Sequence, residues 1–193
     1  MRSIAVYCGS ADAVHTDFLA GARSMGNVLA ERGIRLIYGG GRTGLMGALA
    51  NGVIEKGGEA VGVIIASMNT NALAHQGLSK LEVTATMHER KARMHDLADG
   101  FIAMPGGYGT FDELFETITW SQIGIHAKPI GLLNTRNYFD HLMQAIMHAE
   151  QEGFIFAEHR KMLMSFADPR ALLDAMEKYE HPHGAAQRWM REE

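Results

Sequence analysis

The segment FIAMPGGYGTFDELF, residues 101–115, decides how this chain is expected to fold. Its first four residues form an apolar run that is typical of a strand buried on both faces. The three glycines that follow allow the backbone to bend closely around a ligand. Apolar residues then recur at helical spacing from Phe111 to about Gln122. The segment therefore predicts a strand, a glycine-rich turn and a helix in immediate succession.

The same alternation continues in both directions along the chain. Short apolar runs predict further strands at residues 4–8, 35–38, 60–65, 81–84 and 129–133. Helical spacing of apolar residues predicts helices over 18–29, 45–57, 87–98, 138–152 and 169–179. This alternation favours an α/β fold, a doubly wound parallel sheet with helices on both faces. We expect one domain over residues 1–180 and a polar C-terminal tail over 181–193.

The bulk composition excludes several classes of protein. The chain has 193 residues, of which 47% are hydrophobic and 21% are charged, and its net charge is −4. These values exclude a disordered chain and disfavour a nucleic-acid partner, which needs a basic surface. No apolar run approaches the ~18 residues of a membrane span, and the first residues lack a signal-peptide pattern. A single cysteine, Cys8, excludes an internal disulfide. We therefore expect a soluble cytoplasmic protein without a membrane partner.

The glycine-rich turn at residues 105–110 is the strongest candidate for a ligand site. In a parallel α/β sheet, ligands lie beyond the carboxyl ends of the strands. The free amides at the start of the following helix, together with the helix dipole, favour an anion such as phosphate. The alternative is a tight turn without a ligand. We predict phosphate contacts from Gly106, Gly107, Tyr108, Gly109 and Thr110.

Two further turns follow predicted strands. GGGRTGLMG, residues 39–47, fits the G-x-G-x-x-G pattern of dinucleotide sites. Such sites need an acidic residue at the end of the next strand, to hold the ribose of the cofactor. This chain has Ala66 and Ser67 there. We therefore favour a mononucleotide or a phosphate as the ligand over a nicotinamide cofactor. The turn at residues 8–10 fits a purely structural role equally well. Candidate contacts in the two turns are Gly9, Ser10, Gly40, Gly41 and Thr43.

Two basic residues are predicted to face this region. Thr86 and Glu89 have capping-box spacing, so a helix should begin at Met87. Arg90 and Lys91 then lie in its first turns, near the strand ends, and Lys91 is a candidate phosphate or substrate contact. A guanidinium there suits phosphate or carboxylate, and the alternative is a solvated helix face.

Glu113 has two interpretations. It follows Thr110 by three residues, which is again capping-box spacing, so it could cap the helix. It could instead be a catalytic or ribose-holding carboxylate beside the phosphate turn. On the same face of the helix lie Glu116 and Trp120, and we expect that face to line a site or a subunit contact. A separate apolar stripe is assigned to the core: Phe111, Leu114, Phe115 and Ile118.

Metal and serine chemistry receive no support from the sequence. The chain has ten histidines, but none stands in an H-E-x-x-H arrangement and no cysteine cluster accompanies them. A nucleophilic serine of the G-x-S-x-G type is also missing. We predict no metal.

These motifs together resemble those of the Lonely Guy family, cytokinin-activating phosphoribohydrolases long labelled possible lysine decarboxylases. PGGYGTFDE, residues 105–113, matches the family signature P-G-G-x-G-T-x-x-E, and MHERK, residues 87–91, resembles its second motif. The turns at residues 8–10 and 39–47 also match. The resemblance runs in order from about residue 3 to residue 165.

The resemblance implies a Rossmann-like nucleotide-binding domain and a homodimer with its sites near the subunit interface. It implies hydrolysis of the N-glycosidic bond of N6-substituted adenosine 5′-monophosphates, and often of plain AMP, to free base and ribose 5-phosphate, without a cofactor. By motif position the family's catalytic residues fall on Arg90 and Glu113, and another binding position falls on Thr119. Many members carry an acidic residue where this chain has Ala72, so the base preference stays open.

Two other functions compete with hydrolysis. A nucleotide-binding or sensing module would use the same turn and perform no chemistry, but the additional Glu113 and Arg90 favour an enzyme. A pyridoxal-phosphate decarboxylase needs a cofactor lysine in a deep site, and Lys91 is the only lysine near a motif. DNA binding is disfavoured by the negative net charge.

Overall fold

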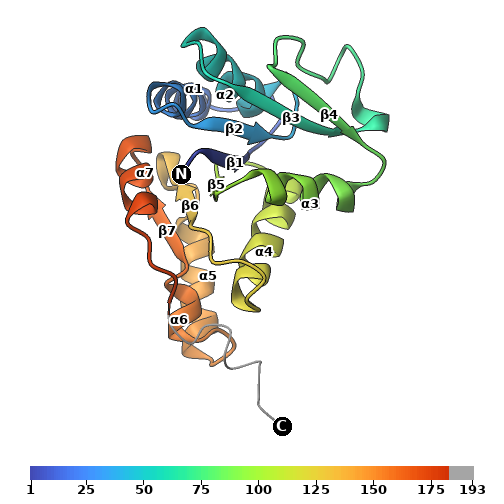
Figure 1. Cartoon of the computed structure of the whole chain (residues 1–193). Coiled ribbons are helices and arrows are strands. Elements are labelled where there is room, and N and C mark those ends of the chain that lie inside the picture. The colour runs from blue at the N-terminus through green and yellow to red at the C-terminus, as the bar shows by residue number, and fades with distance from the viewer. Residues whose placement is uncertain (183–193) are drawn as a thin grey trace.

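The predicted strands, together with one unpredicted edge strand, assemble into one parallel sheet (Figure 1). The computed structural model describes residues 1–182, and within them seven strands pair in the order β4-β3-β2-β1-β5-β6-β7, every pair parallel. All residues of the central strand β1 are buried, as its apolar sequence predicts. The strands are β1 Ser3–Tyr7, β2 Arg35–Tyr38, β3 Ala60–Ile65, β4 Lys80–Thr84, β5 Gly100–Ala103, β6 Ile130–Leu133 and β7 Leu163–Phe166.

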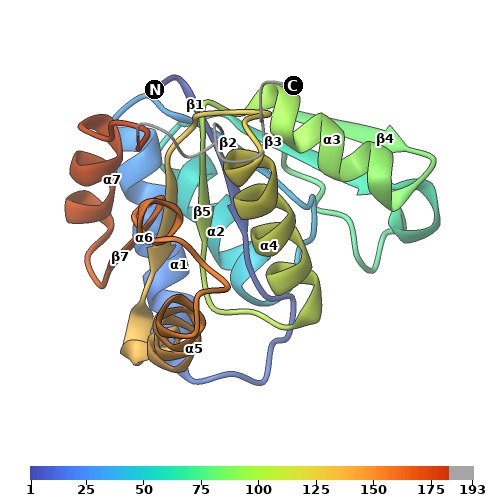
Figure 2. The same ribbon diagram turned by 90° about the horizontal axis from the view of Figure 1, so that it is seen from below.

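Helices cover both faces of this sheet (Figure 2). One apolar cluster joins the sheet to α1, α2 and α7, and a second joins it to α3, α4 and α5. The expected doubly wound α/β sheet is therefore confirmed. Within residues 1–182, no helix has both the length and the apolar character needed to cross a membrane. The helices are α1 Thr16–Glu31, α2 Gly44–Glu55, α3 Met87–Leu97, α4 Tyr108–Gln122, α5 Asp140–Gln151, α6 Ala157–Arg160 and α7 Pro169–Glu177, with short 3-10 turns η1 Ala66–Met68 and η2 Thr135–Asn137.

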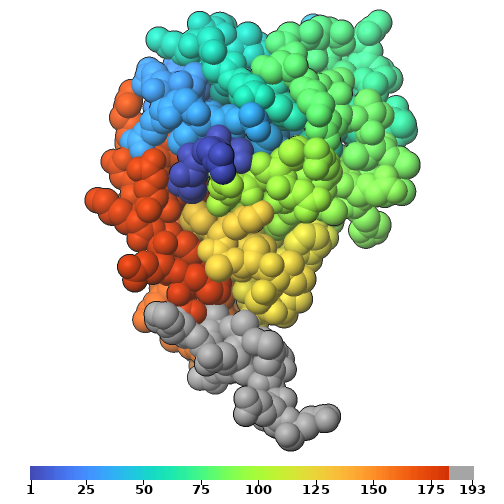
Figure 3. Space-filling view, viewed as in Figure 1, coloured from blue at the N-terminus to red at the C-terminus, as the bar shows by residue number. Residues whose placement is uncertain are grey.

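The order of the strands reverses between β1 and β5, and this reversal locates the site. The chain winds outward from β1 to β4 and then returns through α3 to place β5 beside β1, with Val6 opposite Ile102. The connections that leave these two strands diverge to opposite faces, which opens a crevice at their carboxyl ends. The N-terminus lies at the other end of β1, in the middle of the face seen in Figure 3.

The helix after the glycine-rich turn begins earlier than the sequence predicts. α4 starts at Tyr108 rather than Phe111, because Gly107 adopts the extended conformation of an N-cap. Thr110 therefore lies inside the first turn and cannot form a capping box with Glu113. Half of the glycine-rich turn is thus the first turn of the helix itself.

Other local corrections come from long-range packing. The apolar pattern does not predict α6 or β7. The β7 segment, LMSF, lacks β-branched residues, and within residues 1–182 it pairs with β6 alone. Phe115, which its spacing assigns to the core stripe, is 45% exposed. The polar tail expected over 181–193 falls outside the described residues from 183 onward.

Candidate active site

Three strand-end turns meet beyond the carboxyl edge of the sheet. The Gly9 amide, after β1, donates a hydrogen bond to the Pro105 carbonyl after β5 (3.0 Å). The Gly9 carbonyl accepts from the amides of Leu45 and Met46 at the start of α2 (3.0 and 3.3 Å). A Cβ on Gly106 would lie 2.8 Å from the Gly9 nitrogen, so this close approach requires glycine. The three turns singled out in the sequence therefore form one continuous surface.

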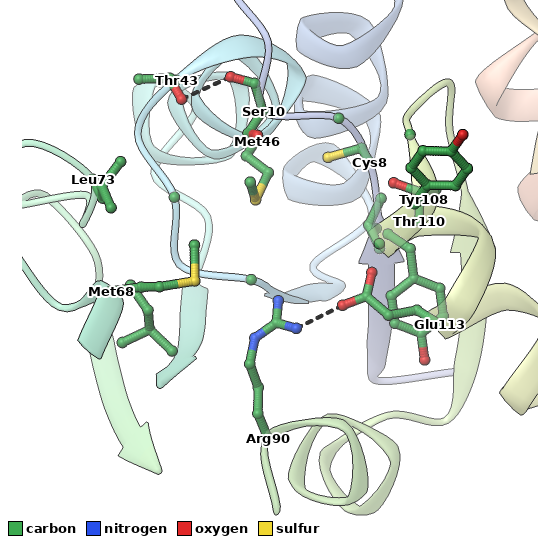
Figure 4. A pocket seen from close by; sticks show the side chains of 18 of the residues that line it. Cys8, Ser10, Thr43, Met46, Met68, Leu73, Arg90, Tyr108, Thr110 and Glu113 are labelled. Carbon is green, nitrogen blue, oxygen red and sulfur yellow. Dashed lines mark hydrogen bonds and ion pairs between the residues drawn. The ribbon is translucent and has the colours of Figure 1, made fainter. Parts of the chain in front are cut away.

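A cavity of about 410 Å³ lies over this surface (Figure 4). Its volume is within the usual range for small-molecule sites. One wall is polar and carries side chains of α3 and α4. The other wall is apolar and comes from α2, the end of β3 and the loop that follows: Met46, Ile64, Met68 and Leu73. Such a lining suits a ligand with one anionic end and one flat, apolar end.

Arg90 and Glu113 form a buried ion pair in the polar wall. Arg90 Nη1 lies 2.7 Å from Glu113 Oε1, and only 13% and 10% of the two side chains are exposed. Arg90 Nε also donates to the Val63 carbonyl (2.9 Å), which fixes the guanidinium plane. A Cβ on Gly39 would lie 2.4 Å from Arg90 Nη2, so the glycine makes room for this side chain. The two residues singled out as catalytic by the resemblance thus touch each other.

Thr86 caps the start of α3, the helix that carries Arg90, and the Glu89 carboxylate accepts from the Ala85 amide (3.0 Å). The Glu89 amide donates to the Thr86 hydroxyl (3.2 Å), and α3 begins at Met87, as predicted. Burial raises the pKa of the Glu113 carboxyl above its ordinary value, and the nearby Arg90 guanidinium opposes this rise without cancelling it. A carboxyl group with a raised pKa is suited to proton transfer close to neutral pH.

The start of α4 presents free amides to the same cavity. Gly107 is the N-cap, and among the described residues no side chain caps this helix. The first amides of a helix have no partner within it, so those of residues 107–110 are available to an anion, and the helix dipole adds partial positive charge. Gly107, Tyr108, Gly109 and Thr110 all line the cavity.

Within the described part of the chain, no group of three or more histidine, cysteine or acidic side chains is arranged to hold a metal ion.

The structure separates the predicted site residues into two groups, those that line the cavity and those that do not. The predicted residues that line the cavity are Gly9, Ser10, Gly41, Thr43, Arg90, Gly107, Tyr108, Gly109, Thr110 and Glu113. Those that do not line it are Gly40, Lys91, Gly106, Glu116 and Thr119.

Lys91 and Thr119 have protein partners. Lys91 Nζ lies 3.0 Å from Asp112 Oδ2 and 3.1 Å from Glu116 Oε1, and 9% of its side chain is exposed. The Thr119 hydroxyl donates to the Phe115 carbonyl in the preceding turn of α4 (2.7 Å). A substrate contact from either residue stays a prediction.

Sequence reasoning does not single out the residues of the apolar wall. Met68 and Leu73 reach the cavity on the long segment between β3 and β4, which is held there by contacts such as the Arg42 amide with the Leu73 carbonyl (2.9 Å). No local pattern marks such residues. Cys8 also lines the cavity, and its position directly after a central strand could have identified it from the sequence. Burial raises the pKa of its thiol.

A buried hydrogen-bond network supports α4 behind Glu113. Thr117 Oγ1 donates to the Glu113 carbonyl (2.8 Å). The Tyr7 hydroxyl and His95 Nε2 lie 3.1 and 2.9 Å from the same Thr117 oxygen, and because its hydrogen is already used, both of them must donate. Burial lowers the pKa of His95 to about 3, so the ring is neutral and carries its proton on Nε2. The network fixes the helical turn that carries Glu113.

Comparison with known proteins finds relatives over most of the chain. A family model described as possible lysine decarboxylase matches residues 46–176. The cytokinin riboside 5′-monophosphate phosphoribohydrolase LOG2 of Arabidopsis thaliana is 42% identical over 182 residues, which cover 94% of this chain and 85% of that protein. The cytokinin riboside 5′-monophosphate phosphoribohydrolase LOG of Oryza sativa subsp. japonica is 43% identical, with 92% and 74% covered.

Solved structures share the fold at much lower sequence identity. The molybdenum cofactor binding protein of Rippkaea orientalis has a TM-score of 0.70 at 22% identity and covers 91% of this chain and 95% of its own. The molybdenum cofactor carrier protein of Chlamydomonas reinhardtii has a TM-score of 0.67 at 20% identity, with 91% and 96% covered. At these identities the likeness concerns the fold alone.

Proposed function

This chain belongs to the Lonely Guy family, and from this membership and the geometry of the site we propose that it is a phosphoribohydrolase. The model of this family is described as possible lysine decarboxylase. The reaction is hydrolysis of the N-glycosidic bond of an adenosine 5′-monophosphate, plain or N6-substituted. Water adds at C1′ as the bond to the base breaks. The products are ribose 5-phosphate and the free base, adenine or a cytokinin.

The 5′-phosphate is assigned to the start of α4. Residues 107–110 line the cavity there with no side-chain cap on the helix, and a dianion is the ligand that a helix start favours most. Binding of this remote group positions the anomeric carbon for reaction. The base is assigned to the apolar wall, where Met46, Ile64 and Leu73 provide contacts for a flat ring.

The chemical step is assigned to Glu113, with Arg90 as its partner. As the base leaves, the ribose gains oxocarbenium character, and a neighbouring carboxylate stabilises that charge or activates the attacking water, as in sugar hydrolysis. The Arg90 guanidinium favours the ionised form of the buried carboxyl, against the effect of burial, and holds its orientation. The observation that supports this proposal most is the buried Arg90–Glu113 pair, which lies in the same cavity as the uncapped helix start.

A decarboxylase that uses pyridoxal phosphate is not supported by the site. That cofactor needs a lysine amine in the cavity. Among the described residues that line the cavity there is no lysine, and the Lys91 amine is ion-paired with Asp112 and Glu116. The cavity that the described residues form therefore lacks the lysine that a decarboxylase of this kind would need.

Chromatography of the reaction products tests the proposal. The protein is incubated separately with AMP, with isopentenyladenosine monophosphate and with adenosine. We expect free base from one or both nucleotides and much less from adenosine, which lacks the phosphate. Binding of AMP without release of base over hours would instead identify a nucleotide-binding module. The two nucleotides also determine the base preference that Ala72 leaves open.

We further propose a homodimer, for which α4 supplies support. Its outer face and the turn after it carry exposed apolar side chains: Phe115 is 45% exposed, Ile123 48% and Ile125 61%. Large apolar side chains exposed on a helix and on the turn after it fit an interface between subunits. Light scattering of the wild type and of Phe115→Glu measures the mass directly, and the variant should be monomeric.

A cytoplasmic location stays a prediction from the sequence.

A further inference from the structure

A tyrosine outside the catalytic cavity contacts the glycine-rich turn from a distant part of the chain. The Tyr138 hydroxyl donates a hydrogen bond to the Gly106 carbonyl (2.5 Å), 32 residues away in the sequence. Tyr138 lines a second cavity, of about 270 Å³, which shares Gly9, Ser10 and Gly107 with the catalytic one. The hydrogen bond therefore reaches the turn from behind, on the side away from Arg90 and Glu113.

This hydrogen bond fixes the orientation of the peptide between Gly106 and Gly107. No described peptide bond is cis, and in a planar trans peptide the carbonyl and the following amide point in opposite directions. With the Gly106 carbonyl held toward Tyr138, the Gly107 amide points toward the opposite side of the turn. A peptide flanked by two glycines rotates easily, because neither residue has a Cβ that restricts its dihedral angles. The turn therefore needs an external contact to hold one orientation.

Tyr138 is 37% exposed, and its ring packs against three other aromatic rings. Its ring packs edge-on against Phe18 and Phe139, with centroids 5.9 and 5.1 Å apart, and parallel to Phe111 at 6.5 Å. The Phe139 amide donates to Asn134 Oδ1 (2.7 Å), which closes the turn that precedes the tyrosine.

That turn adopts an unusual backbone conformation. Arg136 and Asn137 both have positive φ, 55° and 59°, a conformation that is unfavourable for residues other than glycine. Arg136 Nη1 also pairs with Asp17 on α1 (2.7 Å). Surrounding contacts thus hold a strained turn in the conformation that presents the Tyr138 hydroxyl to Gly106.

We propose that Tyr138 is a positioning residue for phosphate binding, which holds the Gly107 amide in the orientation that an anion at the start of α4 requires. The inference rests on the function proposed above, because it places the phosphate at residues 107–110. Tyr138 acts on the phosphate end alone, since the wall assigned to the base is built from α2, β3 and the loop after it.

Calorimetry with the two reaction products tests this role without relying on turnover. The variant Tyr138→Phe keeps the ring and its packing and removes only the hydroxyl. We expect its Kd for ribose 5-phosphate to rise about three- to tenfold, the usual range for one hydrogen bond, and its Kd for adenine to stay within twofold of wild type. Steady-state kinetics should show the same rise in KM for AMP with kcat nearly unchanged. Tyr179→Phe is the matched control, because it removes a hydroxyl that contacts His181 (3.1 Å), away from the site.

Three results would overturn the role of Tyr138. An unchanged Kd for ribose 5-phosphate in Tyr138→Phe shows that the turn keeps its orientation unaided. Equal losses for ribose 5-phosphate and adenine show a general loosening of the fold instead of an effect on phosphate. Failure of the wild type to bind ribose 5-phosphate removes the anion site altogether. Wild-type protein that binds ribose 5-phosphate yet releases no base from AMP contradicts only the proposed reaction.

Discussion

Lys91 on α3 and Glu116 on α4 form an ion pair, with Nζ and Oε1 3.1 Å apart, directly beside the Arg90–Glu113 pair. Lys91 is next to Arg90 in sequence, and Glu116 follows Glu113 by one helical turn. Burial lowers the pKa of the Lys91 amine, but the hydrogen bonds that it donates to Asp112 and Glu116 outweigh this effect and raise the pKa overall, so the amine stays charged. Two parallel ion pairs therefore fix the spacing between α3 and α4.

Lys91→Met should weaken the fold and the chemical step more than phosphate binding. It leaves Asp112 and Glu116 close together without a cation, so we expect the free energy of unfolding in urea to fall by about 1–3 kcal/mol. Movement of Arg90 away from Glu113 should also lower kcat. The Kd for ribose 5-phosphate should stay within twofold. A direct phosphate contact from Lys91 would show the reverse pattern, a large rise in this Kd with little change in stability.

Glu113→Gln should separate binding from turnover. The amide keeps the size of the side chain and its contact with Arg90, so AMP should bind with nearly wild-type affinity. Turnover should fall by about 10²-fold or more, as lost acid–base assistance typically does. The exposed Glu152→Gln at the end of α5 is a matched control and should keep full activity. Near-normal release of base by Glu113→Gln would refute the assignment.

Arg90→Gln should change how kcat depends on pH. Activity that needs ionised Glu113 is lost as the pH falls through the pKa of this carboxyl. Burial raises that pKa and the guanidinium opposes the rise, so removal of the charge raises the pKa further. The acid limb of the residual activity should therefore move to higher pH in Arg90→Gln and much less in Arg90→Lys, which keeps a cation. An acid limb at the same pH in all three proteins would show that another group controls it.

His95 should make the fold sensitive to acid. Burial lowers its pKa from the ordinary 6.5 to about 3, so the unfolded chain takes up a proton in a range where the folded protein does not. The stabilisation is complete above pH 6.5 and is lost as the pH falls toward 3. We expect the free energy of unfolding to fall by about 2 kcal/mol between pH 6.5 and 4.5 from this residue.

Urea denaturation at several pH values measures this effect. His95→Gln retains a donor to Thr117 and should remove much of the pH dependence, although His126, whose pKa burial lowers to about 4, contributes as well. The exposed His148→Gln should behave as wild type. A pH dependence in His95→Gln that equals that of wild type would contradict the role of this histidine.

Local sequence patterns predict much of this molecule. The apolar run at 101–104 and the capping box of Thr86 and Glu89 depend on neighbouring residues, and both predictions hold. Glu113 shows the limit of such patterns. Its spacing from Thr110 fits a capping box, but a glycine already starts the helix, and the carboxylate pairs with Arg90, 23 residues away.

Features that depend on distant segments could not be read from the sequence. Lys91 carries a charge typical of an exposed or ligand-binding residue, yet its partners lie on another helix. The edge strand β7 is specified by pairing with β6 rather than by its own residues. Leu73 lines the site only because the segment between β3 and β4 bends over the turn after β2, where Gly41 pairs with Ala74.

A crystal structure of Glu113→Gln with AMP bound tests the central claim most directly, because the slow variant keeps its substrate intact. The account predicts the 5′-phosphate within hydrogen-bond distance of the amides at residues 107–110, and C1′ beside the side chain at position 113. A phosphate held elsewhere, with these amides contacting only water and position 113 remote from C1′, would contradict it.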